Sequence, residues 1–85
     1  MNNRVNIGID GIQRTKERDL QLSMIAAELF SSPSGKEFLR YLRSITIEMV
    51  NGPNVVQDHL MHQEGQRYIV GMIEQRIAHA HRSKQ

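Results

Sequence analysis

Apolar residues recur every three or four positions along most of the chain, which is the spacing of amphipathic helices. The first such segment is expected from about Thr15 to Phe30, with Thr15 as its N-cap. Glu17 and Asp19 would lie in the first turn, where acidic side chains suit the helix dipole. The apolar stripe comprises Leu20, Met24, Ala27 and Phe30, and it is widened by Leu22, Ile25, Ala26 and Leu29. A stripe this wide predicts contacts on more than one side of the helix.

A serine-rich break separates this helix from a second one, whose start can be read in two ways. Ser32 can be the N-cap, with Pro33 at the first helical position. Alternatively, Ser34 is the N-cap and Glu37 closes a capping box three residues later. Both readings predict a second helix, with an apolar stripe of Phe38, Leu42, Ile45 and Met49.

The second helix is expected to end near Val50, because Gly52 and Pro53 follow and neither continues a helix well. Residues 54–62 are ambiguous and could form a short helical turn. A last helix is expected over about residues 63–81, where apolar residues again recur at helical spacing.

The first 15 residues are more polar than the rest and contain two glycines. Val5, Ile7 and Ile9 alternate with polar or small residues, which is a strand-like pattern. The glycines and the terminal position argue against an independent strand. We interpret the segment as an extended arm that adds these side chains to a partner surface. A frayed terminus is the alternative interpretation.

Together these elements predict an all-α protein, a small three-helix bundle with an extended N-terminal arm. A short fourth helix is an alternative. The expected arm spans residues 1–15, the helical domain residues 16–82 and a C-terminal tail residues 83–85. A chain of 85 residues buries only ~60% of the surface that it exposes when unfolded. The core is therefore thin, and we expect the isolated chain to be marginally stable or oligomeric.

Composition limits the classes of function. The sequence contains no cysteine, which excludes disulfides and thiolate metal sites. No apolar run approaches the ~20 residues of a membrane helix, so no membrane partner is expected. His59 and His62 have the spacing of metal ligands on a helix, but no HExxH run or cysteine completes a site. No serine lies in a recognisable nucleophile motif. We therefore predict a protein that is not an enzyme and binds no metal or cofactor.

Nucleic-acid binding is the main competing interpretation. Lys36, Arg40 and Arg43 could face a phosphate backbone from the second helix of a helix-turn-helix. However, the net charge is only +2, and Glu37 and Glu48 reduce the positive charge of this face. An ordinary solvated helix face explains the three cations better.

Residues 29–39 and 62–70 resemble a family of small tailed-phage proteins, typified by a short product of the structural gene cluster of a Bordetella podovirus. Its members carry a Ser/Thr-Pro-x-Gly helix start, a leucine-rich helix, and a Glu-Gly-x-Arg stretch that opens a final apolar helix. The resemblance covers about residues 20–78. The family's marker positions here are Ser32, Pro33, Gly35, Gly65 and Arg67.

The resemblance implies a virion component or assembly factor, since the family's genes lie near those for head and portal proteins. We therefore expect a non-enzymatic protein that packs, in several copies, against other phage virion proteins in the portal or head–tail region. It would reside in the virion, and in the host cytoplasm during assembly. The alternatives are a small DNA-binding packaging or regulatory protein and a phage inhibitor of a host factor.

Overall fold

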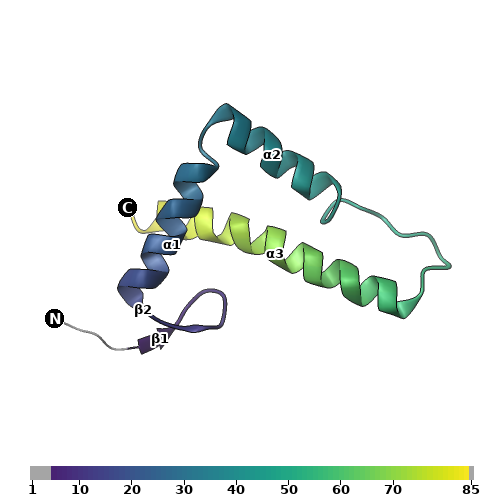
Figure 1. Cartoon of the computed structure of the whole chain (residues 1–85), viewed down its shortest axis with the longest axis horizontal. Coiled ribbons are helices and arrows are strands. Elements are labelled where there is room, and N and C mark those ends of the chain that lie inside the picture. The colour runs from purple at the N-terminus through teal and green to yellow at the C-terminus, as the bar shows by residue number, and fades with distance from the viewer. Residues whose placement is uncertain (1–4, 85) are drawn as a thin grey trace.

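The computed structural model describes residues 5–84. Its elements are β1 (Val5–Ile7), β2 (Gln13–Thr15), α1 (Lys16–Leu29), α2 (Pro33–Ser44) and α3 (Gln57–Arg82). The helix α1 crosses α3 near the C-terminal end of α3, and α2 turns back along the long helix (Figure 1). The three helices thus outline an open triangle, with the two strands lying beside α1 and α3. The protein is mostly helical, but the all-α prediction was wrong in that it omitted the sheet.

The starts of α1 and α2 follow from their capping residues. Thr15 caps α1, and its hydroxyl accepts a hydrogen bond from the Arg18 amide at 3.1 Å. Ser32 caps α2 in the same way, accepting from the Gly35 amide at 3.0 Å, and Pro33 occupies the first helical position. The first of the two predicted starts for α2 is therefore confirmed. Ser34 does not act as the cap.

The end of α2 and the start of α3 were each predicted about six residues too late. The helix α2 ends at Ser44 rather than Val50. Beyond it the chain turns away, and Arg67 donates hydrogen bonds to the carbonyls of Thr46 and Met49 at 3.0 and 2.7 Å. Since these carbonyls are paired with a side chain, a further helical turn is not needed to satisfy them.

The helix α3 starts at Gln57, six residues before the predicted start at residue 63. The ambiguous segment therefore belongs partly to α3, and the part of the chain that the structure describes has no separate fourth helix. Gly65 consequently lies inside α3. Isolated glycines lower helix stability but do not prevent a helix of this length.

The N-terminal segment is a β-hairpin within its described part. The strands pair antiparallel, with Asn6 opposite Arg14 and Ile7 opposite Gln13. Gly11 has a φ of 82°, which a residue with a side chain rarely adopts, and it allows the reversal. The argument that glycines oppose strands was therefore wrong here, because this glycine makes the turn. Residues 1–4 of the predicted arm lie outside the described residues.

The centre of the fold is polar. Asp19, Ser23 and Arg76 are all buried where α1 crosses α3, and Ser23 is fully buried. Among the described residues, only Val70 and Ala80 are buried hydrophobic residues. The described residues therefore form almost none of the closed apolar core that a helix bundle has. The core is even smaller than the thin core that was predicted.

Arg76 organises this centre. Its guanidinium donates to the Asp19 carbonyl at 2.7 Å and to the Ser23 hydroxyl at 3.1 Å. It also forms ion pairs with the carboxylates of Asp19, at 2.7 Å, and Asp10, at 3.3 Å. The buried Asp19 Oδ1 receives no well-directed hydrogen bond, so charge attraction alone holds it beside the guanidinium. One side chain of α3 thus contacts both α1 and the hairpin.

Arg76→Ala should destabilise the protein strongly, because it leaves the buried carboxylate of Asp19 without a counter-charge. Removing one partner of a buried ion pair typically costs about 3–5 kcal/mol. The control is Arg82→Ala, at the exposed end of the same helix, which should change the free energy of unfolding by about 0.5 kcal/mol or less. Urea unfolding followed by circular dichroism measures both. Equal effects of the two variants would refute the central role of Arg76.

Gly35→Ala and Gly65→Ala should have opposite effects. A Cβ at Gly35 would overlap the Leu29 carbonyl oxygen and lie 2.9 Å from the Phe30 Cα, whereas a Cβ at Gly65 would meet nothing within 4 Å. The first variant should lose about 1–3 kcal/mol of stability through overpacking. The second should gain about 1 kcal/mol through helix propensity. Thermal melts of both variants test this, and a stable Gly35→Ala protein would contradict the close approach of α1 and α2.

Candidate interaction surface

The helix α2 leaves one stripe of apolar side chains exposed. None of its residues is buried. Phe38, Tyr41 and the C-cap residue Ile45 recur at the spacing of one helix face, and they are 56%, 53% and 46% exposed. The rings of Phe38 and Tyr41 contact each other, with their centroids 5.7 Å apart. We call these three residues the α2 stripe.

Several polar contacts hold α2 beside α3. Arg43 donates two hydrogen bonds to Glu74 of α3, at 2.7 and 2.6 Å, and one to Glu48, at 3.2 Å. The hydrogen bonds to Glu74, and then the one to Glu48, raise the pKa of Arg43 above its usual value. Asn51 adds a hydrogen bond to Gln63 at 2.6 Å. These contacts fix α2 without covering its stripe.

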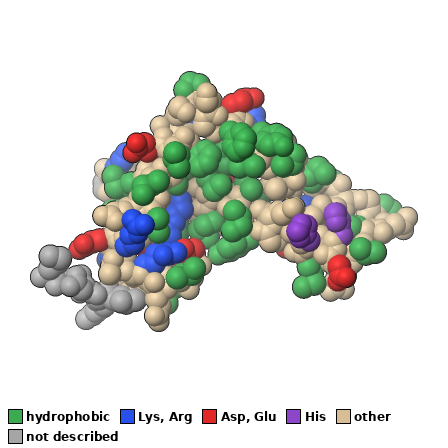
Figure 2. Space-filling model, in the orientation of Figure 1, with side chains coloured by type: hydrophobic (Ala, Val, Ile, Leu, Met, Phe, Trp, Pro, Cys, Tyr) green, Lys and Arg blue, Asp and Glu red, His purple; other side chains and the backbone are tan. Residues whose placement is uncertain are grey.

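Exposed hydrophobic side chains also lie on the other elements. Figure 2 shows them gathered over α2 and the middle of α3. Outside the α2 stripe, the large hydrophobic residues that are exposed are Ile7, Ile12, Met24, Ile25, Leu29, Met49, Val50, Val56, Leu60, Met61, Tyr68 and Ile69. Single exposed hydrophobic residues are normal, but a surface this rich in them is typical of proteins that contact partners.

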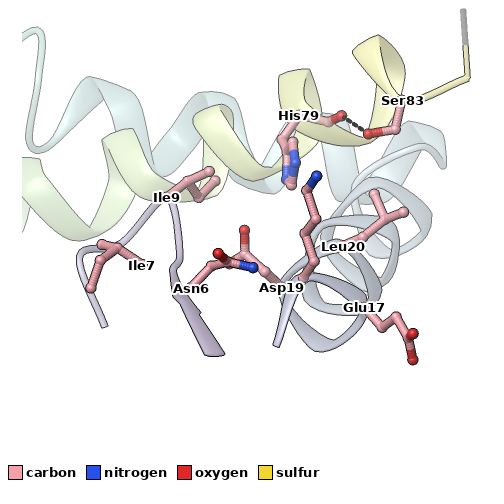
Figure 3. A pocket seen from close by; sticks show the side chains of 9 residues that line it. Asn6, Ile7, Ile9, Glu17, Asp19, Leu20, His79 and Ser83 are labelled. Carbon is pink, nitrogen blue, oxygen red and sulfur yellow. Dashed lines mark hydrogen bonds between the residues drawn. The ribbon is translucent and has the colours of Figure 1, made fainter. Parts of the chain in front are cut away.

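The hairpin places part of the predicted arm surface beside a pocket. Ile7 is 65% exposed, and Ile9 is partly buried. Both line a pocket of about 590 Å³, together with Lys16 and Leu20 of α1 and His79 of α3 (Figure 3). The backbone of Val5 belongs to β1, but its side chain lies outside the described part of the structure.

Asp10 anchors the hairpin to the helices. Its carboxylate accepts from Arg14 at 2.8 Å and from the buried Arg76 at 3.3 Å, and its carbonyl accepts from the Tyr68 hydroxyl at 3.2 Å. The hydrogen bonds from Arg14 and from the Ile12 amide lower the pKa of Asp10 from 3.8 to about 2. The described part of the N-terminal segment is therefore docked against α3 rather than frayed.

The three candidate phosphate contacts differ in their surroundings. Arg43 is held by Glu74 and Glu48, and Arg40 forms an ion pair with Glu37. Lys36 is exposed at the start of α2. A phosphate backbone on this face would have to compete with carboxylates for both arginines. This arrangement favours the interpretation as a solvated helix face.

The marker positions of the family have structural roles. Ser32, Pro33 and Gly35 form the tight corner between α1 and α2. Gly65 and Arg67 lie within α3 and not at its start, because the helix begins earlier than predicted. Arg67 instead holds the turn after α2 through the carbonyls of Thr46 and Met49.

Sequence analysis missed the residues that build the polar centre. Asp19 and Ser23 are spaced four apart, which places them on one face of α1, and this was the available signal. Arg76 was not identified from the sequence. His79 also belongs here, since its Nδ1 lies 2.7 Å from the Ser23 hydroxyl. His59 and His62 are exposed on α3.

The described residues show neither a metal cluster nor a membrane-spanning helix. Within residues 5–84, no three His, Asp or Glu side chains lie close enough together to hold a metal ion. None of the helices in this range is both long and apolar enough to cross a bilayer.

Comparisons with known proteins identify one similarity. The model of a family described as Bbp19-like phage protein matches residues 26–84, which is more than half of the chain. The matched region contains α2, α3 and the end of α1, and it leaves out the hairpin. No curated protein and no solved structure matches the chain.

Asp10 should make the stability depend on pH in the acid range. Because its pKa is lower in the folded state, about 2 against 3.8, the folded state binds fewer protons between these values. The stabilisation that the ionised Asp10 carboxylate contributes is thus complete above about pH 4, and it is lost as the pH falls towards 2. Thermal melts from pH 2 to 5 should show a shallower pH dependence for Asp10→Asn than for the wild type. If the melting temperatures of the variant and the wild type change in parallel with pH, the assignment of this pH dependence to Asp10 is wrong.

Proposed function

Because this chain belongs to the Bbp19-like phage protein family, we propose that it is a non-enzymatic virion or assembly protein of a bacteriophage. It packs against other virion proteins, in several copies, in the portal or head–tail region. It reaches the virion from the host cytoplasm, where assembly takes place.

The observation that carries this proposal is the uncovered apolar surface around α2. Burial of apolar side chains is the main favourable term in folding and in association. Here the α2 stripe and its neighbours stay about half exposed, while the centre of the fold is polar. Contacts with neighbouring subunits would supply the burial that the chain does not achieve alone.

The arrangement around Ser23 supports the non-enzymatic part of the proposal. A serine hydroxyl 2.7 Å from a histidine nitrogen resembles the nucleophile and base of a hydrolase. However, Ser23 is fully buried, and its hydroxyl also accepts a hydrogen bond from Arg76. No substrate can reach it without separating α1 from α3. The pair is better explained as part of the contact between these helices.

Quantitative mass spectrometry of purified phage particles tests the proposal. We expect the protein at a fixed copy number per particle, constant through density-gradient and size-exclusion purification. A non-structural phage protein of similar size and abundance in the same lysate is the control, and it should be removed by purification. If the chain is removed together with this control, the proposal of a virion protein is wrong.

The same measurement on phage particles that are assembled with a Phe38→Glu chain tests the α2 stripe directly. Phe38 is exposed, so the isolated variant should fold normally. If the α2 stripe makes the contacts, however, purified particles should contain fewer copies of the variant chain than of the wild type. Met61→Glu is the matched control, because Met61 is also exposed but lies on α3. Equal incorporation of both variants would argue against the α2 stripe as the contact surface.

A further inference from the structure

The connection between α2 and α3 contains the one Asn-Gly pair of the sequence, Asn51 and Gly52. The backbone from Met49 to Gly52 belongs to no helix or strand. Gly52 is exposed, and Asn51 is half-buried. Among the described residues, the Gly52 amide donates no backbone hydrogen bond. This amide nitrogen is therefore not held away from the side chain that precedes it.

An asparagine followed by a glycine is well suited to a reaction between its side chain and the backbone. The asparagine side chain is short enough to fold back onto the backbone amide that follows it. A glycine has no Cβ to shield that nitrogen, and its backbone adopts conformations that other residues rarely reach. Both conditions are met at Asn51. Asn54, in contrast, is followed by the β-branched Val55, which shields the amide and stiffens the chain.

We propose that Asn51 is a site of spontaneous deamidation in the folded protein. The Gly52 nitrogen forms a bond to Cγ of Asn51, the bond from Cγ to Nδ2 breaks, and Nδ2 leaves as ammonia with the proton of the Gly52 amide. The product is a cyclic succinimide, which water then opens. Attack of water at Cγ gives aspartate. Attack at the backbone carbonyl carbon gives isoaspartate, in which the chain continues through the former side chain.

Gln63 controls how readily the ring closes. Nδ2 of Asn51 donates a hydrogen bond to Oε1 of Gln63 at 2.6 Å, and Gln63 is buried on α3. This bond must break before the Asn51 side chain can turn towards the Gly52 nitrogen. The net strength of one hydrogen bond between neutral groups is modest. The contact with Gln63 therefore slows the reaction without preventing it.

The Asp-Gly pair of the hairpin, Asp10 and Gly11, could form the same ring by losing water, but the structure opposes the reaction there. The Asp10 carboxylate accepts hydrogen bonds from Arg14 and from the buried Arg76, which hold it in place. The lowered pKa of Asp10 keeps this carboxylate ionised, and an anion is a poor target for a nitrogen nucleophile. Of the two pairs, only Asn51 and Gly52 are placed to react.

The two products change the connection in different ways. An aspartate keeps the original backbone, and the Gln63 amide can rotate so that Nε2 donates to the new carboxylate. An isoaspartate adds one carbon to the main chain, so the contact with Gln63 cannot keep its present geometry. Either product lowers the net charge of +2 by one. Deamidation therefore alters the surface beside the exposed side chains of Met49 and Val50.

Peptide mass spectrometry of the folded full-length protein, held in mildly alkaline buffer, tests the proposal. We expect Asn51 to convert to aspartate and isoaspartate while Asn54, in the same connection, remains an amide. Conversion should be faster at higher pH, because the attacking nitrogen must lose its proton. If Asn51 remains an amide in the folded protein, or if Asn54 converts equally fast, the proposal is wrong.

Gly52→Ala is the matched variant. The φ angle of Gly52 is not positive, and a Cβ there would meet nothing within 4 Å, so the fold should be unchanged. The methyl group should nevertheless slow the conversion of Asn51 at least about fivefold, by shielding the nitrogen and restricting the backbone. Gly71→Ala, which also has open space around its Cβ, is the control and should leave the rate unchanged. Circular dichroism establishes that both variants fold, and equal rates in both would overturn the mechanism.

Gln63→Leu tests the restraint on the side chain. Leucine has a similar volume but cannot accept the hydrogen bond, so the Asn51 side chain should turn more freely and convert several-fold faster. The free energy of unfolding of this variant is measured alongside, because Gln63 is buried. Conversion at the wild-type rate in a folded Gln63→Leu protein would overturn the role assigned to Gln63.

Discussion

The buried contact between Arg76 and the carboxylates of Asp19 and Asp10 is the interaction on which the rest of the structure depends. It joins α3 to α1 and to the hairpin through one guanidinium. Charges taken out of water must be paired closely, because an unpaired partner would cost several kcal/mol. This requirement restricts where α1 and the hairpin can lie on α3, whereas apolar contacts alone would allow sliding.

A polar centre has a consequence for the surface. The chain has enough apolar residues to cover helix faces, but the place where α1 crosses α3 is taken by Arg76, Asp19 and Ser23. An ion pair between Arg43 and Glu74 joins α2 to α3, and the aromatic side chains of α2 remain exposed. The same ion pairs that define the subunit therefore leave it with apolar surface available for association, which connects its fold to an assembly role.

Local signals predicted some elements well and others poorly, for physical reasons. Thr15 was correctly predicted as a cap, and Ser32 was one of the two caps predicted for α2, because capping depends on residues within one turn. The end of α2 was missed because Ile45 and Met49 continue the helical spacing, whereas the chain leaves the helix to meet Arg67. The hairpin was missed because its strands have three residues each and depend on docking through Asp10.

Three properties follow from the amino-acid sequence alone: the chain forms three helices, the first two begin at serine or threonine caps, and the apolar content is too low for a large core. These properties depend on local hydrogen bonds and on composition. The ion-pair network at the centre and the exposure of the α2 stripe follow only from the way in which the helices pack. The network joins residues more than 50 positions apart, such as Asp19 and Arg76, and α2 is held by Arg43 and Glu74, which are 31 positions apart. Neither pairing leaves a periodic signal along the chain.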